Sequence, residues 1–178
     1  MANLPPLART IARCFALCFF AVLFAAPQRA HADEYTDVNR LVQSKQYAEA
    51  LARADKYLAD KPRDPQMRFL KGVIEAETGK REQAIATYTQ LTQEYPELPE
   101  PYNNLAVLYA QASEYDKARE ALEGAVRANP NYAIAHENLG DVYAKLASQS
   151  YAKAKQIDPA NATAPAKLTL VHQLLQSH

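Results

Sequence analysis

Apolar side chains recur every three or four residues along most of the chain, which is the spacing of one face of an α-helix. Two such stretches follow one another between residues 99 and 128, with a polar turn between them. The first carries its apolar positions at Leu105, Leu108, Tyr109 and Ala112, and the second at Ala118, Ala121, Leu122 and Ala125. The pattern therefore predicts a pair of amphipathic helices in this part of the chain.

The same pattern recurs along the chain with a constant period. Three sets of positions share this period without a gap: Pro62, Pro96 and Pro130; Ala50, Ala84 and Ala118; Val38, Gly72 and Ala106. Each proline marks the end of a helix, because proline has no N–H and pushes the preceding residue out of the helical region. Helices are therefore expected at 34–44, 48–60, 65–78, 82–94, 99–112 and 116–128.

The repeat resembles the tetratricopeptide repeat, in which each unit of about 34 residues consists of two antiparallel helices. The third unit matches the family signature in order, at Tyr102, Leu105, Ala106, Tyr109, Ala118, Leu122, Ala125 and Pro130. The second unit matches at Gly72, Gly79, Ala84, Tyr88 and Pro96, and the first at Tyr47, Ala50 and Pro62. The resemblance implies an all-α, right-handed α-solenoid with full units at 31–64, 65–98 and 99–132 and a shortened fourth at 133–161.

Small residues are expected where the two helices of a unit cross. Gly72, Ala106 and Gly140 occupy one such position, and Ala84 and Ala118 face them. A larger side chain at the crossing would overpack it, at a cost of roughly 1–3 kcal/mol.

The fourth unit departs from the period because its second half arrives five residues early. Pro159 follows Pro130 by a shorter interval than Pro130 follows Pro96, and the missing residues fall where the turn between the two helices should be. The segment 141–157 contains no Gly or Pro that would specify a reversal. We therefore expect one fused helix over about 133–158. The alternative is a tight turn at 148–150, because serines favour caps and turns.

A fused helix is expected to project past the repeats and to expose apolar side chains that could mediate self-association, namely Leu146, Tyr151 and Ile157. The segment 162–178 is predicted to be a C-terminal capping helix over the last repeat. Its helical part, 163–176, carries an apolar side made of Leu168, Val171, Leu174 and Leu175.

The N-terminal segment 1–32 is predicted to be a signal peptide. Arg9 and Arg13 precede an apolar run over residues 14–26, which is shorter than the roughly 20 residues of a spanning helix. Ala30-His31-Ala32 supplies a small-x-small cleavage pattern, so the mature chain would be residues 33–178. We expect export to a bacterial periplasm, with no integral membrane segment after cleavage. The alternative is an uncleaved N-terminal anchor.

Charge narrows the class of partner. The formal net charge of +0 includes a basic leader with three arginines and no acid, so the rest of the chain has three more acidic than basic side chains. An acidic body argues against binding to nucleic acid or to an anionic membrane surface. Both cysteines, Cys14 and Cys18, lie in the leader, so the mature chain has no disulfide, thiolate metal site or cysteine nucleophile.

The sequence predicts no catalytic residue, no metal site and no cofactor. The histidines of the mature chain, His136, His172 and His178, have no metal-ligand spacing. No serine lies in a nucleophile elbow, and there is no Gly-rich phosphate loop. His136 is interpreted as a packing residue at the opening of a repeat helix.

Stacked helix pairs form an extended concave face, and in the tetratricopeptide family the first helix of each unit lines it. The resemblance therefore implies a peptide-binding groove made of Asn39, Phe69, Val73, Asn103, Asn104, Val107, Gln111, Glu137, Asn138 and Asp141. Asn103 and Asn104 are expected to clamp a peptide backbone, because amides both donate and accept hydrogen bonds. The alternative for Asn104 is that it helps to satisfy a helix start.

The chemistry of this groove indicates its partner. Family members that bind chaperone tails hold a terminal carboxylate with lysine and arginine, but here those positions are Phe69, Asn103, Glu137 and Asn138. The groove runs from apolar to acidic, so we expect a protein or peptide segment with an apolar anchor and a basic end. The predicted function is an interaction scaffold of the cell envelope. The alternatives are an assembly factor or chaperone for envelope machinery (pilus, outer membrane, cytochrome maturation or cell-wall synthesis), or a structural oligomer formed through the fourth-unit and C-terminal helices.

Overall fold

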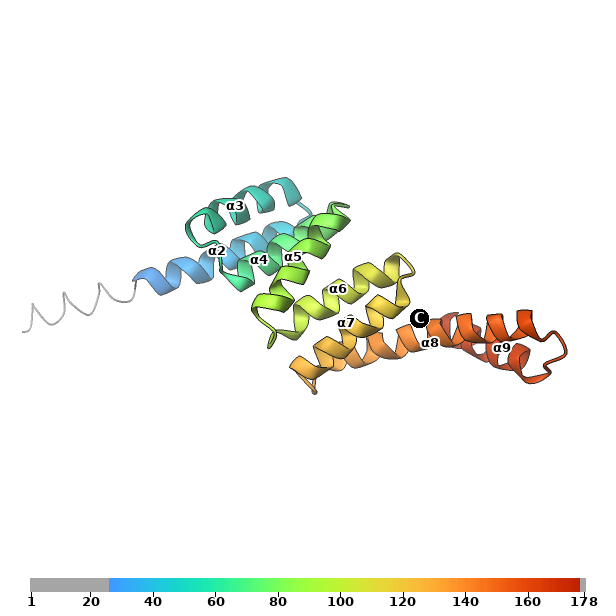
Figure 1. Ribbon diagram of the computed structural model, residues 1–178. Coiled ribbons are helices and arrows are strands. Elements are labelled where there is room, and N and C mark those ends of the chain that lie inside the picture. The colour runs from blue at the N-terminus through green and yellow to red at the C-terminus, as the bar shows by residue number, and fades with distance from the viewer. Residues whose placement is uncertain (1–25, 177–178) are drawn as a thin grey trace, which may run out of the picture. The chain divides into compact units, whose positions relative to one another are not determined.

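The computed structural model describes residues 26–176, with side chains from Glu34 onwards, and this part of the chain is helical without a strand (Figure 1). It divides into two units, of which the first ends at Pro62 and the second begins at Arg63. The first unit contains α2 (Ala26–Gln43) and α3 (Tyr47–Asp60). The second contains α4 (Pro65–Glu77), α5 (Arg81–Glu94), α6 (Pro99–Gln111), α7 (Tyr115–Ala128), α8 (Ala133–Ile157) and α9 (Thr163–Gln176).

The five helices predicted between residues 48 and 128 agree with the observed boundaries to within one residue. The first helix differs, because α2 begins at Ala26 rather than at 34 and continues through the predicted cleavage motif at 30–32. Proline in a first helical turn is tolerated, which allows α2 to include Pro27. Residues 1–25 of the predicted leader lie outside the described residues, so the signal peptide stays a prediction.

In the first unit, α2 and α3 pack through small and aliphatic side chains that are fully or almost fully buried: Val38, Leu41, Ala50 and Ala54. Arg53 on α3 donates to the carboxylate of Asp37 on α2 at 2.7 Å. The two helices therefore form a complete helix pair.

In the second unit, each helix from α4 to α9 packs against the next one along the chain. One buried cluster runs through α5, α6, α7 and α8, with Tyr88, Leu91, Leu105, Leu122 and Val142 among its members. None of the described helices is long and apolar enough to cross a membrane.

The turn inside each full repeat depends on one residue with a left-handed backbone. Lys45, Gly79 and Ser113 have φ values of 57°, 74° and 61°, and they recur with the same period as the prolines. The amide that follows each of them donates to the carbonyl five residues earlier, as Lys80 does to Glu75 at 2.8 Å. This geometry ends the first helix and starts the second.

The fourth repeat lacks this turn, and α8 is a single helix of 25 residues, as predicted. The position that would carry the turn is Ala147, which lies inside α8. Ser150 donates its hydroxyl to the carbonyl of Leu146 at 2.9 Å, so the serine is accommodated within the helix. The alternative of a tight turn at 148–150 is wrong.

The expected exposure along α8 is correct only for Ile157, which is 72% exposed. Leu146 packs against the main cluster, and Tyr151 is half-buried with the Lys167 ammonium 5.6 Å from its ring centroid. Tyr151 is covered because α9 turns back and packs along the second half of α8 (Figure 1). On α9, Leu168, Val171 and Leu175 are half-buried, whereas Leu174 is exposed, contrary to its predicted place on the same side.

The helix crossings show which small residues are required. A Cβ atom added at Gly72 would lie 2.6 Å from Cε1 of Tyr88, and one added at Gly124 would lie 2.6 Å from Cδ1 of Tyr102. A Cβ atom added at Gly140 meets nothing within 4 Å. Gly140 therefore matches Gly72 in sequence register but not in packing.

We predict that Gly72→Ala leaves the protein roughly 1–3 kcal/mol less stable than Gly140→Ala does, because only the first methyl group collides with a neighbour. The gain in helix propensity, about 1 kcal/mol, is common to both variants and cancels in the comparison. Urea denaturation followed by circular dichroism measures the difference. Equal midpoints would show that the α4–α5 crossing has room to spare.

Candidate functional site

Two shallow depressions flank α6. The first has a volume of about 180 Å³, lies between α4 and α6, and is lined by Val73, Ala76, Glu77, Tyr88, Asn104, Val107, Leu108 and Gln111. The second has a volume of about 190 Å³, lies between α6 and α8, and is lined by Ala106, Val107, Ala110, Gln111, Leu122, Asn138, Asp141 and Val142. Because Val107 and Gln111 line both, these two side chains separate neighbouring depressions on one surface.

The sizes and linings of the depressions indicate what they can accept. Each is smaller than the roughly 300–1,000 Å³ of a typical small-molecule site, and so suits a single side chain. Five of the eight lining residues of the second depression are apolar, and Val107 is 39% exposed. Each depression also has one carboxylate, Glu77 in the first and Asp141 in the second.

A chain of amide groups connects the helices at this surface. Asn138 donates to Oδ1 of Asn103 at 2.8 Å, and Asn104 donates to the hydroxyl oxygen of Tyr88 at 3.2 Å. Asn103 in turn approaches Oδ1 of Asn104 at 3.5 Å. The amides therefore link α5, α6 and α8, and Asn103 is only 6% exposed and lines neither depression. In the structure the Asn103 amide holds neighbouring helices, whereas the sequence interpretation had it clamp a peptide backbone.

The structure brings six of the ten predicted groove residues to the two depressions: Val73, Asn104, Val107, Gln111, Asn138 and Asp141. Phe69 is half-buried, with its ring centroid 5.7 Å from that of Tyr88. Glu137 is exposed and lines neither depression. Asn39 is half-buried on α2 in the first unit.

Tyr88 is the main residue that the groove prediction missed. It lies on α5, the second helix of its repeat, and reaches the first depression through the space left by Gly72. Its side chain is almost fully buried, and burial raises the pKa of its hydroxyl to about 12. The signal was present in the sequence, because a glycine at a helix crossing leaves room for a large side chain from the opposite helix.

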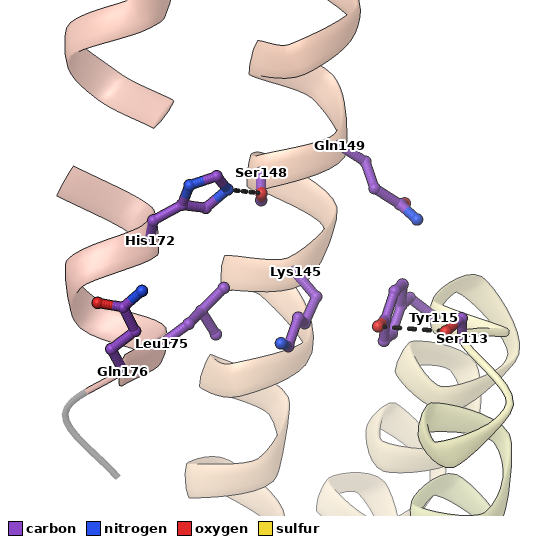
Figure 2. Close-up of a pocket in the computed structure, with 8 residues that line it drawn as sticks. All are labelled: Ser113, Tyr115, Lys145, Ser148, Gln149, His172, Leu175 and Gln176. Atoms are coloured by element: carbon purple, nitrogen blue, oxygen red, sulfur yellow. Dashed lines mark hydrogen bonds between the residues drawn. The ribbon is translucent and has the colours of Figure 1, made fainter. Parts of the chain in front are cut away.

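A third, more open crevice of about 510 Å³ lies at the C-terminal end of the second unit (Figure 2). Figure 2 shows His172 of α9 and Ser148 of α8 pointing toward each other, and the Ser148 Oγ lies 3.0 Å from Nε2 of His172. A serine nucleophile also needs a group that orients the imidazole and donors for the oxyanion, and the described residues that line the crevice include no carboxylate. Within residues 26–176, no group of three or more His, Cys, Asp or Glu side chains could hold a metal ion.

Two family models described as tetratricopeptide repeat match this chain, one over residues 35–99 and the other over residues 75–140. Together they span more than half of the 178 residues. With the helix pairs and the recurring turn geometry described above, they show that the chain belongs to the tetratricopeptide-repeat family.

Solved structures show the same fold. The tetratricopeptide-repeat domain of Sgt2 from Aspergillus fumigatus is 18% identical, with a TM-score of 0.62 over 67% of this chain and 80% of that one. The first such domain of RPAP3, bound to an HSP90 peptide, is 16% identical, with a TM-score of 0.59 over 65% and 92%. The Yersinia enterocolitica type III secretion chaperone SycD, in complex with a peptide of the translocator YopD, is 17% identical, with a TM-score of 0.59 over 66% and 95%. At these identities the likeness concerns the fold alone.

We predict that alkaline pH destabilises the protein through Tyr88. An unfolded tyrosine loses its proton near pH 10, whereas folded Tyr88 keeps it until about pH 12. Stability present below pH 10 is therefore lost as the pH rises toward 12, by roughly 2–3 kcal/mol for this group. Urea midpoints at pH 9 and pH 11.5 should fall less in Tyr88→Phe than in the unchanged protein. Tyr143→Phe, which alters an exposed tyrosine, should behave like the unchanged protein, and equal losses in all three would contradict the assignment.

Proposed function

We propose that this protein is a non-enzymatic scaffold that binds a peptide segment of a partner protein across α6. The observation that carries the proposal is the pair of adjacent depressions that share Val107 and Gln111. Two side-chain sites beside each other on one surface suit two neighbouring anchors of a peptide, whereas a small metabolite needs one deeper cavity. The tetratricopeptide family consists in general of interaction modules, which agrees with this reading.

The lining residues support a particular peptide chemistry. The second depression is mostly apolar and takes an aliphatic or aromatic anchor. The carboxylates of Glu77 and Asp141 favour a lysine or arginine next to that anchor, since opposite charges steer and orient an approaching segment. Asn104 and Gln111 add amide groups that can hydrogen-bond to the backbone of the peptide.

The neighbouring structures support the peptide class without naming the partner. RPAP3 is bound to an HSP90 peptide and SycD to a YopD peptide, so domains of this fold take peptide segments from larger proteins. We further propose that the partner belongs to the bacterial cell envelope, because the basic and apolar residues 1–32 have the pattern of a cleaved export signal.

We predict that Val107→Glu weakens binding to peptides selected from a random display library by at least about tenfold, because it places a charge between the two depressions. Leu170→Glu is the matched control, since Leu170 is an exposed apolar residue of α9 outside both depressions. Isothermal titration calorimetry of the selected peptides measures the affinities, which should lie near the micromolar range. Selected peptides without an apolar residue beside Lys or Arg, or equal loss in both variants, would overturn the groove assignment.

The export proposal has its own test. Intact mass of the protein recovered from the periplasm of an expressing bacterium should correspond to residues 33–178, with Asp33 at the N-terminus. Ala32→Arg should block processing, because signal cleavage needs a small residue at that position. A chain that keeps residues 1–32 and sediments with membranes would instead favour the uncleaved anchor.

A further inference from the structure

One face of α8 is covered by none of the other helices within residues 26–176. We call it the open face of α8, and it consists of Ala133, His136, Gly140, Tyr143, Ala147, Ser150, Ala154 and Ile157. These residues are spaced alternately by three and four along all 25 residues of the helix, and none of them is buried. Tyr143 is 48% exposed and Ile157 is 72% exposed. Alternation of three and four is the spacing of a seam between two paired helices.

The corresponding face is covered in the other repeats of the second unit. Gly72 on α4 lies against Tyr88 of α5, and Tyr102 on α6 lies against Gly124 of α7. Ala106, at the repeat position of Gly140, is 1% exposed. In each case the second helix of the same repeat covers the first, so the open face marks where a second helix of the fourth repeat would lie.

The chain's own second helix cannot cover this face. Its sequence is present as residues 147–157, where Ala147, Tyr151 and Ala154 correspond to Ala118, Leu122 and Ala125 of the third repeat. Because the turn is absent, these residues continue α8 in a straight line and leave the first half of the helix uncovered. The residues of the second helix and the face that they would cover therefore lie one after the other on the same straight helix, so they cannot contact each other within one chain.

We propose that two copies of this chain pair through the open face of α8, antiparallel, so that each copy supplies the second helix of the other copy's fourth repeat. The repeat register specifies the alignment. To transfer a contact from an earlier repeat to the fourth, positions on the first helix are increased by the full repeat period at each step. Positions on the second helix are increased in the same way, except that the last step uses the shorter Pro130–Pro159 interval. This shift converts the Gly72–Tyr88 contact into Gly140 with Tyr151 of the second copy.

The second crossing contact moves in the same way, and the Tyr102–Gly124 contact becomes His136 with Lys153 of the second copy. The two transferred contacts have their midpoints half a residue to either side of position 145 of α8. A single two-fold axis at that position therefore brings each contact to within one residue of its transferred register, and does so twice, as an isologous dimer requires.

This axis also aligns the small residues of the open face. It sets Tyr143 against Ala147, Gly140 against Ser150 and His136 against Ala154 of the second copy. Glycine, alanine and serine at these positions let the two helices approach closely.

Charge complementarity supports the same alignment. In the second unit, Asn103 of α6 accepts a hydrogen bond from Asn138 of α8 at 2.8 Å, which links the first helices of consecutive repeats. Asn103 moved on by the full period gives Glu137 of one copy. Asn138 moved on by the shorter Pro130–Pro159 interval, because α9 follows the shortened fourth repeat, gives Lys167 on α9 of the other copy. Both side chains are exposed and of opposite charge. In the proposed dimer Glu137, which lines neither depression of the groove, therefore contacts Lys167 of the second copy.

The first test is sedimentation equilibrium of the full chain over a range of concentrations. We expect a reversible dimer, with a dissociation constant raised at least about tenfold by Gly140→Arg. The monomer accepts this side chain, because nothing lies within 4 Å of a Cβ at Gly140, and circular dichroism should confirm unchanged helicity. Ala152→Arg is the matched control, since it places the same side chain at an exposed alanine on the opposite side of α8. A monomer at all concentrations, or a dimer insensitive to Gly140→Arg, would overturn the proposal.

Disulfide cross-linking tests the alignment directly. Gly140→Cys and Ser150→Cys are made as separate variants in a chain whose Cys14 and Cys18 are replaced by serine, and the two are then mixed. We expect a disulfide-linked dimer in the mixture and little in either variant alone, because only positions 140 and 150 of different copies face each other. Ala152→Cys mixed with Gly140→Cys is the control and should not cross-link. Cross-linking that is equal for 150 and 152 would reject the antiparallel alignment.

None of these positions lines either depression, so peptide binding across α6 can succeed or fail independently.

Discussion

Each full repeat of this protein depends on one residue that adopts a left-handed backbone. At Lys45, Gly79 and Ser113 this conformation ends the first helix, reverses the chain, and lets the second helix pack across the first. The close approach at Gly72 and the burial of Ala106 follow from that reversal. Where the residue and its turn are missing, the chain continues as α8, and the packing that the reversal would have produced is absent.

The surface of the second unit results from contributions by both helices of a repeat. The first helices supply the exposed side chains around Val107, while Tyr88 and Leu122 reach the depressions from the second helices. The amides of Asn103, Asn104 and Asn138 join α5, α6 and α8 at this surface, and Asn104 and Asn138 line the two depressions themselves.

The sequence predicted the fold well because the period carries most of the information. A proline at the end of each repeat and an apolar spacing of three and four determine where helices begin and end, and the lack of Gly or Pro after Asp141 correctly indicated that α8 is continuous. The candidate site was harder to predict. Periodicity indicates which face a side chain lies on, but not that Asn103 bonds to Asn138 on the next repeat or that Ser148 approaches His172. The cover over Tyr151 was missed for a similar reason, since α9 reaches it only by turning back along α8.

The length of the missing segment has a consequence for the angular phase of α8. In the third repeat, Ala106 and Ala118 are twelve residues apart and lie on different helices. In the fourth repeat, Gly140 and Ala147 are seven residues apart on one helix, which is close to two complete turns at about 3.6 residues per turn. The two half-faces therefore merge into one continuous strip. A deletion one residue shorter or longer would rotate the second half by about 100° and divide the strip between two sides of the helix.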